Sequence, residues 1–191
     1  MSRRPLHAIS RITYEAQRLA GEGPVEAVTI SAVVAASGAP AGSIYHRFAS
    51  RDDLLAAAWL DALGAFQASF LGVLVAAPDS AAVGVVRWAR AHPVPARLLV
   101  LRLPRDLGAT AWAETRRAEA RRLSAALESG LDQFCSAHLG GPGGDARRRA
   151  TFALLDLPHA ALRRYLAAGV PPPTAVDDYV TSASRAILAA G

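Results

Sequence analysis

Clusters of glycine and proline divide this 191-residue chain into apolar segments that have the lengths of helices. The interruptions lie at 21–24, 38–40, 92–95, 140–144 and 171–173. Glycine suits left-handed turns, and proline suits the start of a helix but not its interior, so each cluster predicts a helix boundary. The sequence thus predicts an all-α protein with helices at 6–19, 30–36, 41–48, 51–76, 80–91, 96–103, 110–138, 145–168 and 174–189. Within 145–168, Pro158 predicts a kink or a break.

The composition supports a folded helical chain. Hydrophobic residues make up 52% and charged residues 19%, so the chain can bury a core, while only 6% aromatic residues argue against a β-sandwich. The single cysteine, Cys135, cannot form an internal disulfide or a cysteine-rich zinc site. The N-terminus lacks the apolar run of a signal peptide, and we find no stretch apolar enough for a bilayer. We therefore expect a cytoplasmic protein with no membrane contact, no metal and no cofactor.

The region from Thr29 to Leu55 carries the strongest motif, TISAVVAASGAPAGSIYHRFASRDDLL. Two short helical segments separated by a glycine turn have the proportions of a helix-turn-helix. The whole run resembles the DNA-binding signature of the tetracycline-repressor (TetR) family. The resemblance covers roughly the first third of the chain. It implies a bacterial regulator with a helix-turn-helix DNA-binding domain at 1–50 and a helical ligand-binding and dimerisation domain at 51–191.

The residue chemistry of the motif also fits DNA. A recognition helix must be small at its leading end and must offer hydroxyl and cationic groups, and 41–47 meets both conditions. Thr29 can bind a phosphate at the start of its helix. Arg51 resembles the family's usual lysine, a phosphate contact that also anchors the domain. The expected DNA-binding residues are Thr29, Ser31, Ala41, Gly42, Ser43, Tyr45, His46, Arg47 and Arg51, over a small core of Val33, Ile44, Phe48 and Leu54.

The middle helices combine aromatic side chains with many alanines, a mixture that can leave a cavity of ligand size. For any one of these side chains, simple packing in the core is the alternative. The family resemblance implies a pocket in this region, so we expect a small hydrophobic effector. The candidate ligand-binding residues are Phe66, Phe70, Trp88, His92, Trp112, Phe134, Phe152, Asp156 and His159.

The last two predicted helices have more apolar surface than one small domain can cover. We expect them to pair with their symmetry mates as a four-helix bundle in a homodimer. The candidate dimer residues are Leu162, Tyr165, Tyr179, Ala183 and Ile187.

These features predict a ligand-responsive repressor that binds a palindromic double-stranded DNA operator as a dimer and is released by an apolar effector. The alternative is a helical ligand-binding protein without operator binding, because Pro40 and Ala41 stand where the family commonly has a hydroxyl cap and a basic residue. An enzyme comes third. Cys135 and His138, like Asp156 and His159, are three residues apart, but neither pair has further ligands at matching spacing, so no catalytic or metal residue is assigned.

Overall fold

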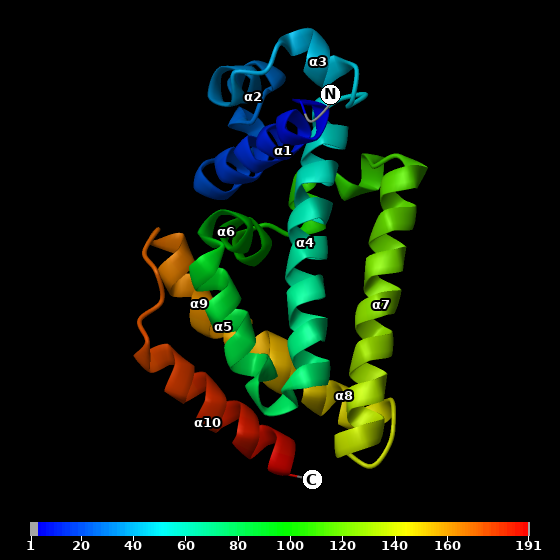
Figure 1. Ribbon diagram of the computed structural model, residues 1–191, viewed down its shortest axis with the longest axis vertical. Coiled ribbons are helices and arrows are strands. Elements are labelled where there is room, and N and C mark those ends of the chain that lie inside the picture. Colours follow the sequence, from blue (N-terminus) through cyan, green and yellow to red (C-terminus); the bar gives the residue numbers. More distant parts are fainter. Residues whose placement is uncertain (1–3, 191) are drawn as a thin grey trace. The chain divides into compact units, whose positions relative to one another are not determined.

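The computed structural model describes residues 4–190, with side chains from residue 9 onward. This part of the chain is helical and contains no strand, which confirms the predicted all-α class. The α-helices are α1 (Arg4–Glu22), α2 (Ile30–Ser37), α3 (Ala41–Tyr45), α4 (Arg51–Ala76), α5 (Ala81–Ala91), α6 (Pro93–Leu101), α7 (Glu114–His138), α8 (Gly144–Thr151), α9 (Leu157–Ala167) and α10 (Ala175–Ala189) (Figure 1).

The chain forms two compact units, and α4 and α7 each contribute to both. The head unit comprises the residues up to 63 together with 94–120, and the body unit comprises 64–93 together with the residues from 121 onward. These units follow spatial contacts, so the head unit includes segments far apart in sequence. The division into 1–50 and 51–191 follows the order of the chain, and we keep it as a proposal for the division of function.

The head unit is built around a small apolar core. Figure 1 shows α1, α2 and α3 gathered around the first turns of α4. The predicted core is confirmed, because Val33, Ile44, Phe48 and Leu54 are all buried, together with Ile12 of α1. Burying such side chains stabilises a fold by about 1.5–3 kcal/mol each. The short helix α3 therefore owes its place to Ile44 and Phe48 rather than to its own helix propensity.

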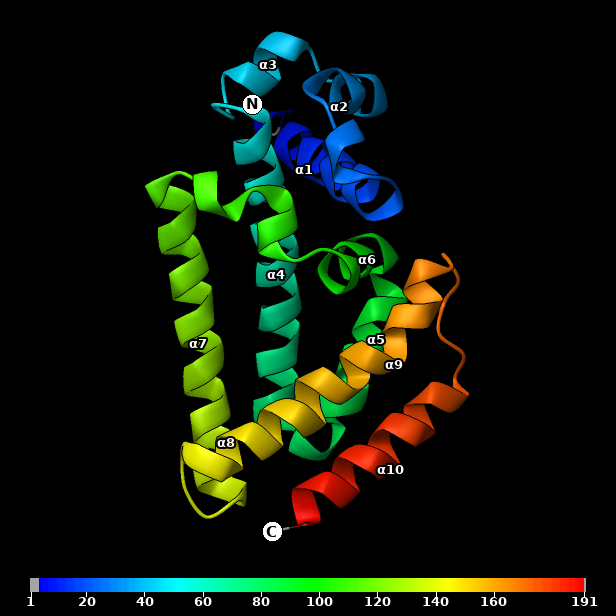
Figure 2. The same ribbon diagram turned by 180° about the vertical axis from the view of Figure 1, so that it is seen from behind.

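In the body unit, α5 packs against α9 and α10. Figure 2 shows α8 and α9 following one another as a single rod, with α10 beside α9. Between α8 and α9 the turn Phe152–Asp156 is a π-helix. Pro158 has no N–H to donate to the carbonyl of Leu154, so the regular ladder is interrupted at this point. The helical path nevertheless continues through the π turn, so the irregularity near Pro158 is a change of hydrogen-bond pattern and not the division of the helix that the sequence allowed.

Several helix boundaries differ from the sequence prediction. α1 extends to Glu22 rather than ending at 19, and α7 begins at Glu114 rather than at 110, after a short 3-10 helix at Ala109–Ala111. α6 begins at Pro93, although the prolines at 93 and 95 were expected to precede the helix. Proline is accepted in the first turn, where its missing N–H is not needed. α3 ends at Tyr45, because His46 and Arg47 form a turn rather than a further helical turn.

Length and composition alone would allow α4 to cross a membrane. The core helix of a soluble protein meets the same criterion. Here Leu54, Leu60, Phe70 and Leu74 of α4 are buried against other helices of the chain.

Candidate nucleic-acid interface

The first helix of the motif, α2, begins at a hydroxyl cap. The Thr29 Oγ1 accepts a hydrogen bond from the Ala32 N–H at 3.1 Å, as an N-cap residue does. The same oxygen lies 2.8 Å from the Ser31 Oγ, and both residues are exposed. The sequence predicted both residues for DNA contact, and the structure places their hydroxyls side by side at the start of α2.

The turn between α2 and α3 depends on Gly38. Its backbone is left-handed, with φ of 67° and ψ of 11°, and its N–H donates to the Val34 carbonyl at 2.9 Å. Only glycine adopts this conformation without strain. The Ser37 Oγ accepts from the Ala39 N–H at 3.2 Å and supports the turn further. This turn fixes the direction in which α3 leaves α2.

The outer face of α3 is open. Ala41 and Gly42 are exposed, and a Cβ added to Gly42 would meet nothing within 4 Å. Tyr45 is 62% exposed, and His46 is exposed beside it. Ile44 holds the opposite side of the helix in the core. α3 therefore presents a small leading end with polar side chains behind it, as a helix that enters the major groove requires.

Arg47 does not extend away from the head. Its Nη1 donates to the Ser43 carbonyl at 2.9 Å and also contacts the Ser43 Oγ. Both side chains are half-buried. The structure thus joins two residues that the sequence predicted as separate contacts, and Arg47 orients the Ser43 hydroxyl.

Arg51 lies at the start of α4 and binds the backbone that leads into α2. Its Nε donates to the Val28 carbonyl at 2.6 Å, and its Nη2 donates to the Val25 carbonyl. Its Nη1 also pairs with Asp52 at 2.9 Å. Of the two roles that the sequence predicted for Arg51, the geometry shows the anchor.

We expect Arg51→Ala to destabilise the protein by about 1–3 kcal/mol, because two carbonyls lose a charged donor. Its affinity for all DNA sequences should fall by a similar factor, since the start of α2 loses its support. Thermal unfolding and binding to specific and unrelated duplexes measure the two effects. Arg51→Lys is the matched control, because it keeps the charge but not the forked geometry, and it should retain only part of the stability. A change in sequence preference with full stability would contradict this role.

Sequence reasoning missed two arginines that hold the head together. Arg97 of α6 donates from Nε to the Gly21 carbonyl at 3.0 Å. Arg102 donates to the carbonyls of Ala20 at 2.9 Å and Gly23 at 2.6 Å. Both therefore satisfy carbonyls at the C-terminal end of α1, where a cation is also favoured by the helix dipole. No local pattern reveals contacts between residues so far apart in the chain.

The predicted ligand-binding residues fall into several places. Phe70, Phe66, Trp88 and His92 form an aromatic ladder in the body unit, with successive ring centroids 5.9, 5.2 and 5.0 Å apart. Phe134 contacts His138 instead, with centroids 4.9 Å apart.

The other predicted ligand-binding residues lie elsewhere. Trp112 belongs to the head unit, where its ring lies 6.1 Å from Trp59 and its Nε1 donates to the Leu107 carbonyl at 3.1 Å. Phe152, Asp156 and His159 are exposed on the π turn and α9.

The predicted dimer residues differ in exposure. Leu162 is only 1% exposed, so it packs inside its own protomer and cannot present surface to a partner. Tyr179 is 72% exposed on α10. Tyr165, Ala183 and Ile187 are half-buried. The sequence indicated more apolar surface on these helices than one small domain can cover, but not which side faces the protomer's own core.

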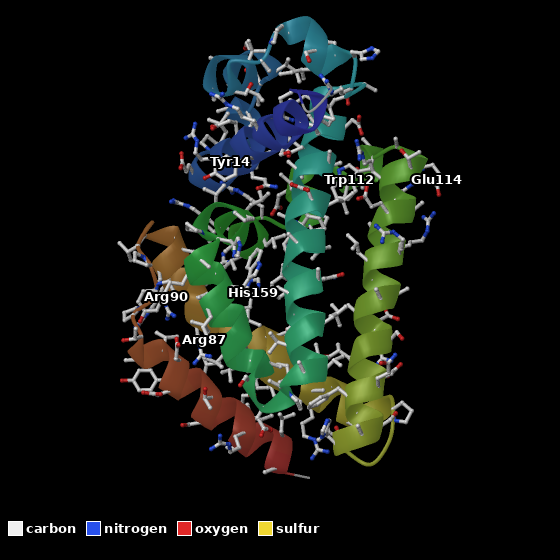
Figure 3. The ribbon with its side chains drawn as sticks, in the orientation of Figure 1. Tyr14, Arg87, Arg90, Trp112, Glu114 and His159 are labelled. Carbon is white, nitrogen blue, oxygen red and sulfur yellow. The ribbon has the colours of Figure 1, made fainter. Side chains whose placement is uncertain are left out.

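An ion-pair cluster ties α5 to the start of α10. Arg90 pairs with Asp177 at 2.7 Å and Arg87 pairs with it at 3.4 Å (Figure 3). Arg90 also donates to the Pro172 carbonyl at 3.1 Å. The hydrogen bond and charge of Arg90, with a smaller effect of Arg87, hold the pKa of the Asp177 carboxyl below its usual range. The carboxylate thus supports the fold at neutral pH and loses this effect only as the pH falls through the lowered pKa.

The structure brings together no metal-binding group of three or more His, Cys, Asp or Glu side chains between residues 9 and 190. Cys135 is fully buried in α7. Burial, together with the nearby Asp132, raises the pKa of its thiol. A buried thiol of this kind behaves as a small apolar core residue.

An open recognition helix on a fixed glycine turn, in an otherwise helical chain, defines a helix-turn-helix DNA-binding regulator. The family model described as bacterial regulatory proteins, tetR family, matches residues 12–58. Residues 12–58 are thus similar to the DNA-binding domain of this family.

The whole fold is also that of a known regulator. The fatty acid degradation regulator FadR from Bacillus halodurans superposes with a TM-score of 0.72 over 96% of this chain and 95% of that one. The two sequences are 14% identical, so the likeness concerns the fold. A comparison with curated protein sequences finds no match.

Proposed function

We propose that this protein is a cytoplasmic transcription repressor that binds an inverted-repeat operator as a homodimer and is released by a small, mainly apolar effector. The open face of α3 carries the proposal. Ala41, Gly42, Tyr45 and His46 are exposed there, while Ile44 and the left-handed Gly38 fix the helix from behind. Such a surface has no role in the packing of the head and suits a DNA groove.

Dimerisation is supported by apolar surface that the protomer leaves uncovered. Phe152, Val170 and Tyr179 are exposed in the last third of the chain, and Ala183 follows Tyr179 one turn further along α10. Large exposed aromatics in neighbouring elements are typical of protein interfaces. A two-fold dimer would repeat the recognition helix and so match an inverted repeat in DNA.

The effector part of the proposal is supported by the body unit. Its aromatic ladder runs from the buried Phe70 to the exposed His92, across α4 and α5. An apolar ligand that contacts such rings can favour one arrangement of the surrounding helices over another. It shifts DNA affinity only by its differential affinity for the two arrangements.

Selection of bound sites from random DNA tests the proposal. We expect inverted repeats whose half-sites are separated by about one helical turn or somewhat more. A selected motif without dyad symmetry would contradict the dimeric repressor.

A second candidate is a helical ligand-binding protein that does not bind an operator. Pro40 supports it, because this residue gives α3 no side-chain cap hydrogen bond and α3 spans only Ala41–Tyr45. Recovery of no enriched sequence from the same selection would favour this candidate.

A further inference from the structure

Gln67 on α4 holds a buried amide oxygen without a partner. The side chain is 4% exposed, and its Oε1 makes no hydrogen bond to any described residue. Gln17 in α1 offers a direct comparison, because it is also 4% exposed. The Gln17 Nε2 donates to the Ala58 carbonyl and to the Asp61 Oδ2, both at 3.0 Å. The chain thus satisfies one buried glutamine and leaves the other open.

Gln67 lies on the face of α4 that also carries Gly64 and Leu71, three residues before it and four after it. A Cβ on Gly64 would lie 3.9 Å from the Leu123 side chain, and a Cβ on Gly130 would lie 2.4 Å from that of Leu71. This face of α4 therefore packs closely against α7. Phe66 and Phe70 of the aromatic ladder lie within one turn of Gln67 on the same helix.

A buried water molecule is a poor hydrogen-bond partner for the Gln67 Oε1. A buried water needs two to four polar partners, and an apolar interior supplies few. Gln67 and Ser184 are the buried polar side chains among the described residues of the body unit, and neither is charged. An unpartnered buried amide costs free energy, so its presence calls for an explanation.

We propose that Gln67 is the polar anchor of the effector site. The effector is then an uncharged, mainly apolar molecule with an O–H or N–H group that donates to the Gln67 Oε1. This inference rests on the proposed function, because it gives a chemical class to the effector proposed there. An ionised carboxylate fits less well, since its charge would be buried beside a neutral amide.

Such a site distinguishes ligands by the donor rather than by their apolar area. An analogue that lacks the donor leaves the Gln67 oxygen unpaired, and a single hydrogen bond of this kind changes affinity by about tenfold. Added methylenes raise the affinity of both compounds alike and leave this ratio unchanged.

The first test compares two substitutions in the full-length protein without ligand. Gln67→Leu removes an unsatisfied group at nearly constant volume, so the melting temperature should rise by about 2–4 °C. Gln17→Leu removes a satisfied amide of equal burial, so it should lower the melting temperature by a similar amount or more. A fall in melting temperature for Gln67→Leu would show that its amide is already paired, and would overturn the inference.

The second test uses two pairs of probes at pH 7, with binding measured by isothermal titration calorimetry. The pairs are 1-decanol with 1-fluorodecane, and 1-naphthol with 1-fluoronaphthalene. At least one donor-bearing probe should bind the wild-type protein about tenfold more tightly than its fluorinated partner. Gln67→Leu should bind the two members of that pair equally.

The possible outcomes distinguish a failure of the role of Gln67 from a failure of the proposed function. Equal binding within both pairs by the wild type, or a donor preference retained in Gln67→Leu, overturns the role of Gln67 and leaves the apolar effector site standing. Binding of no probe overturns both the inference and the apolar effector site. A probe that binds with donor preference but leaves operator affinity unchanged supports the anchor and contradicts its use in release from DNA.

Discussion

Gly42→Glu should lower the affinity of the protein for its operator at least about 100-fold while leaving the head unit folded. Gly42 lies on the exposed face of α3, and a side chain there meets no protein atom within 4 Å. Glutamate would place bulk and a negative charge where the backbone must approach DNA phosphates and base edges. Like charges in contact cost several kcal/mol, which corresponds to a loss of this size. Fluorescence anisotropy with the selected operator measures the loss.

Gly72→Glu is a closely matched control. Gly72 is also an exposed glycine inside a helix, α4, and a side chain there likewise meets nothing within 4 Å. Both substitutions change the net charge by the same amount, and both replace glycine by a better helix former. Gly72→Glu should therefore change operator affinity less than about threefold, and neither variant should lose thermal stability. Equal loss of DNA binding in the two variants would place the effect in net charge and not in α3.

The helices of this protein can be predicted because residues close to each boundary determine where the helix begins or ends. Glycine at 38 and proline at 40 and 158 act through the backbone of their own turn, so the sequence predicts the helix-turn-helix and the irregular turn before α9. Thr29 and Gly38 likewise determine their own geometry. At these points the local sequence is enough to predict the structure, whereas the exact ends of α1, α3, α6 and α7 differ from the prediction.

The contacts that complete the site are not local. Arg51 reaches back to Val25 and Val28, and Arg102 reaches Ala20 across the chain, so their partners appear only in the folded protein. Periodicity also cannot tell which apolar stripe faces inward. It grouped Leu162 with Tyr179, whereas the first is buried in its own protomer and the second is exposed. Gln67 stood in an apolar stretch without any sign that its oxygen would lack a partner.

Tyr179→Glu should convert the proposed dimer to monomers at micromolar concentration. Tyr179 is 72% exposed in the single chain, so its replacement removes little from the protomer's own core. In a two-fold interface, one substitution alters both subunits and therefore acts twice. Tyrosine is a frequent centre of binding energy, and a carboxylate buried without a partner costs several kcal/mol. Sedimentation velocity measures the change in mass.

The same variant should lose operator affinity at least about 100-fold, because each monomer brings only one recognition helix to one half-site. Val75→Glu is the control, since Val75 is an equally prominent apolar residue, 79% exposed on α4, outside the proposed interface. It should remain dimeric and bind the operator with normal affinity. If Val75→Glu gives monomers and Tyr179→Glu does not, the interface lies at α4. Monomeric wild-type protein that still selects an inverted repeat would instead show that the two heads meet only on DNA, and the exposed surface of α10 would then need a different partner.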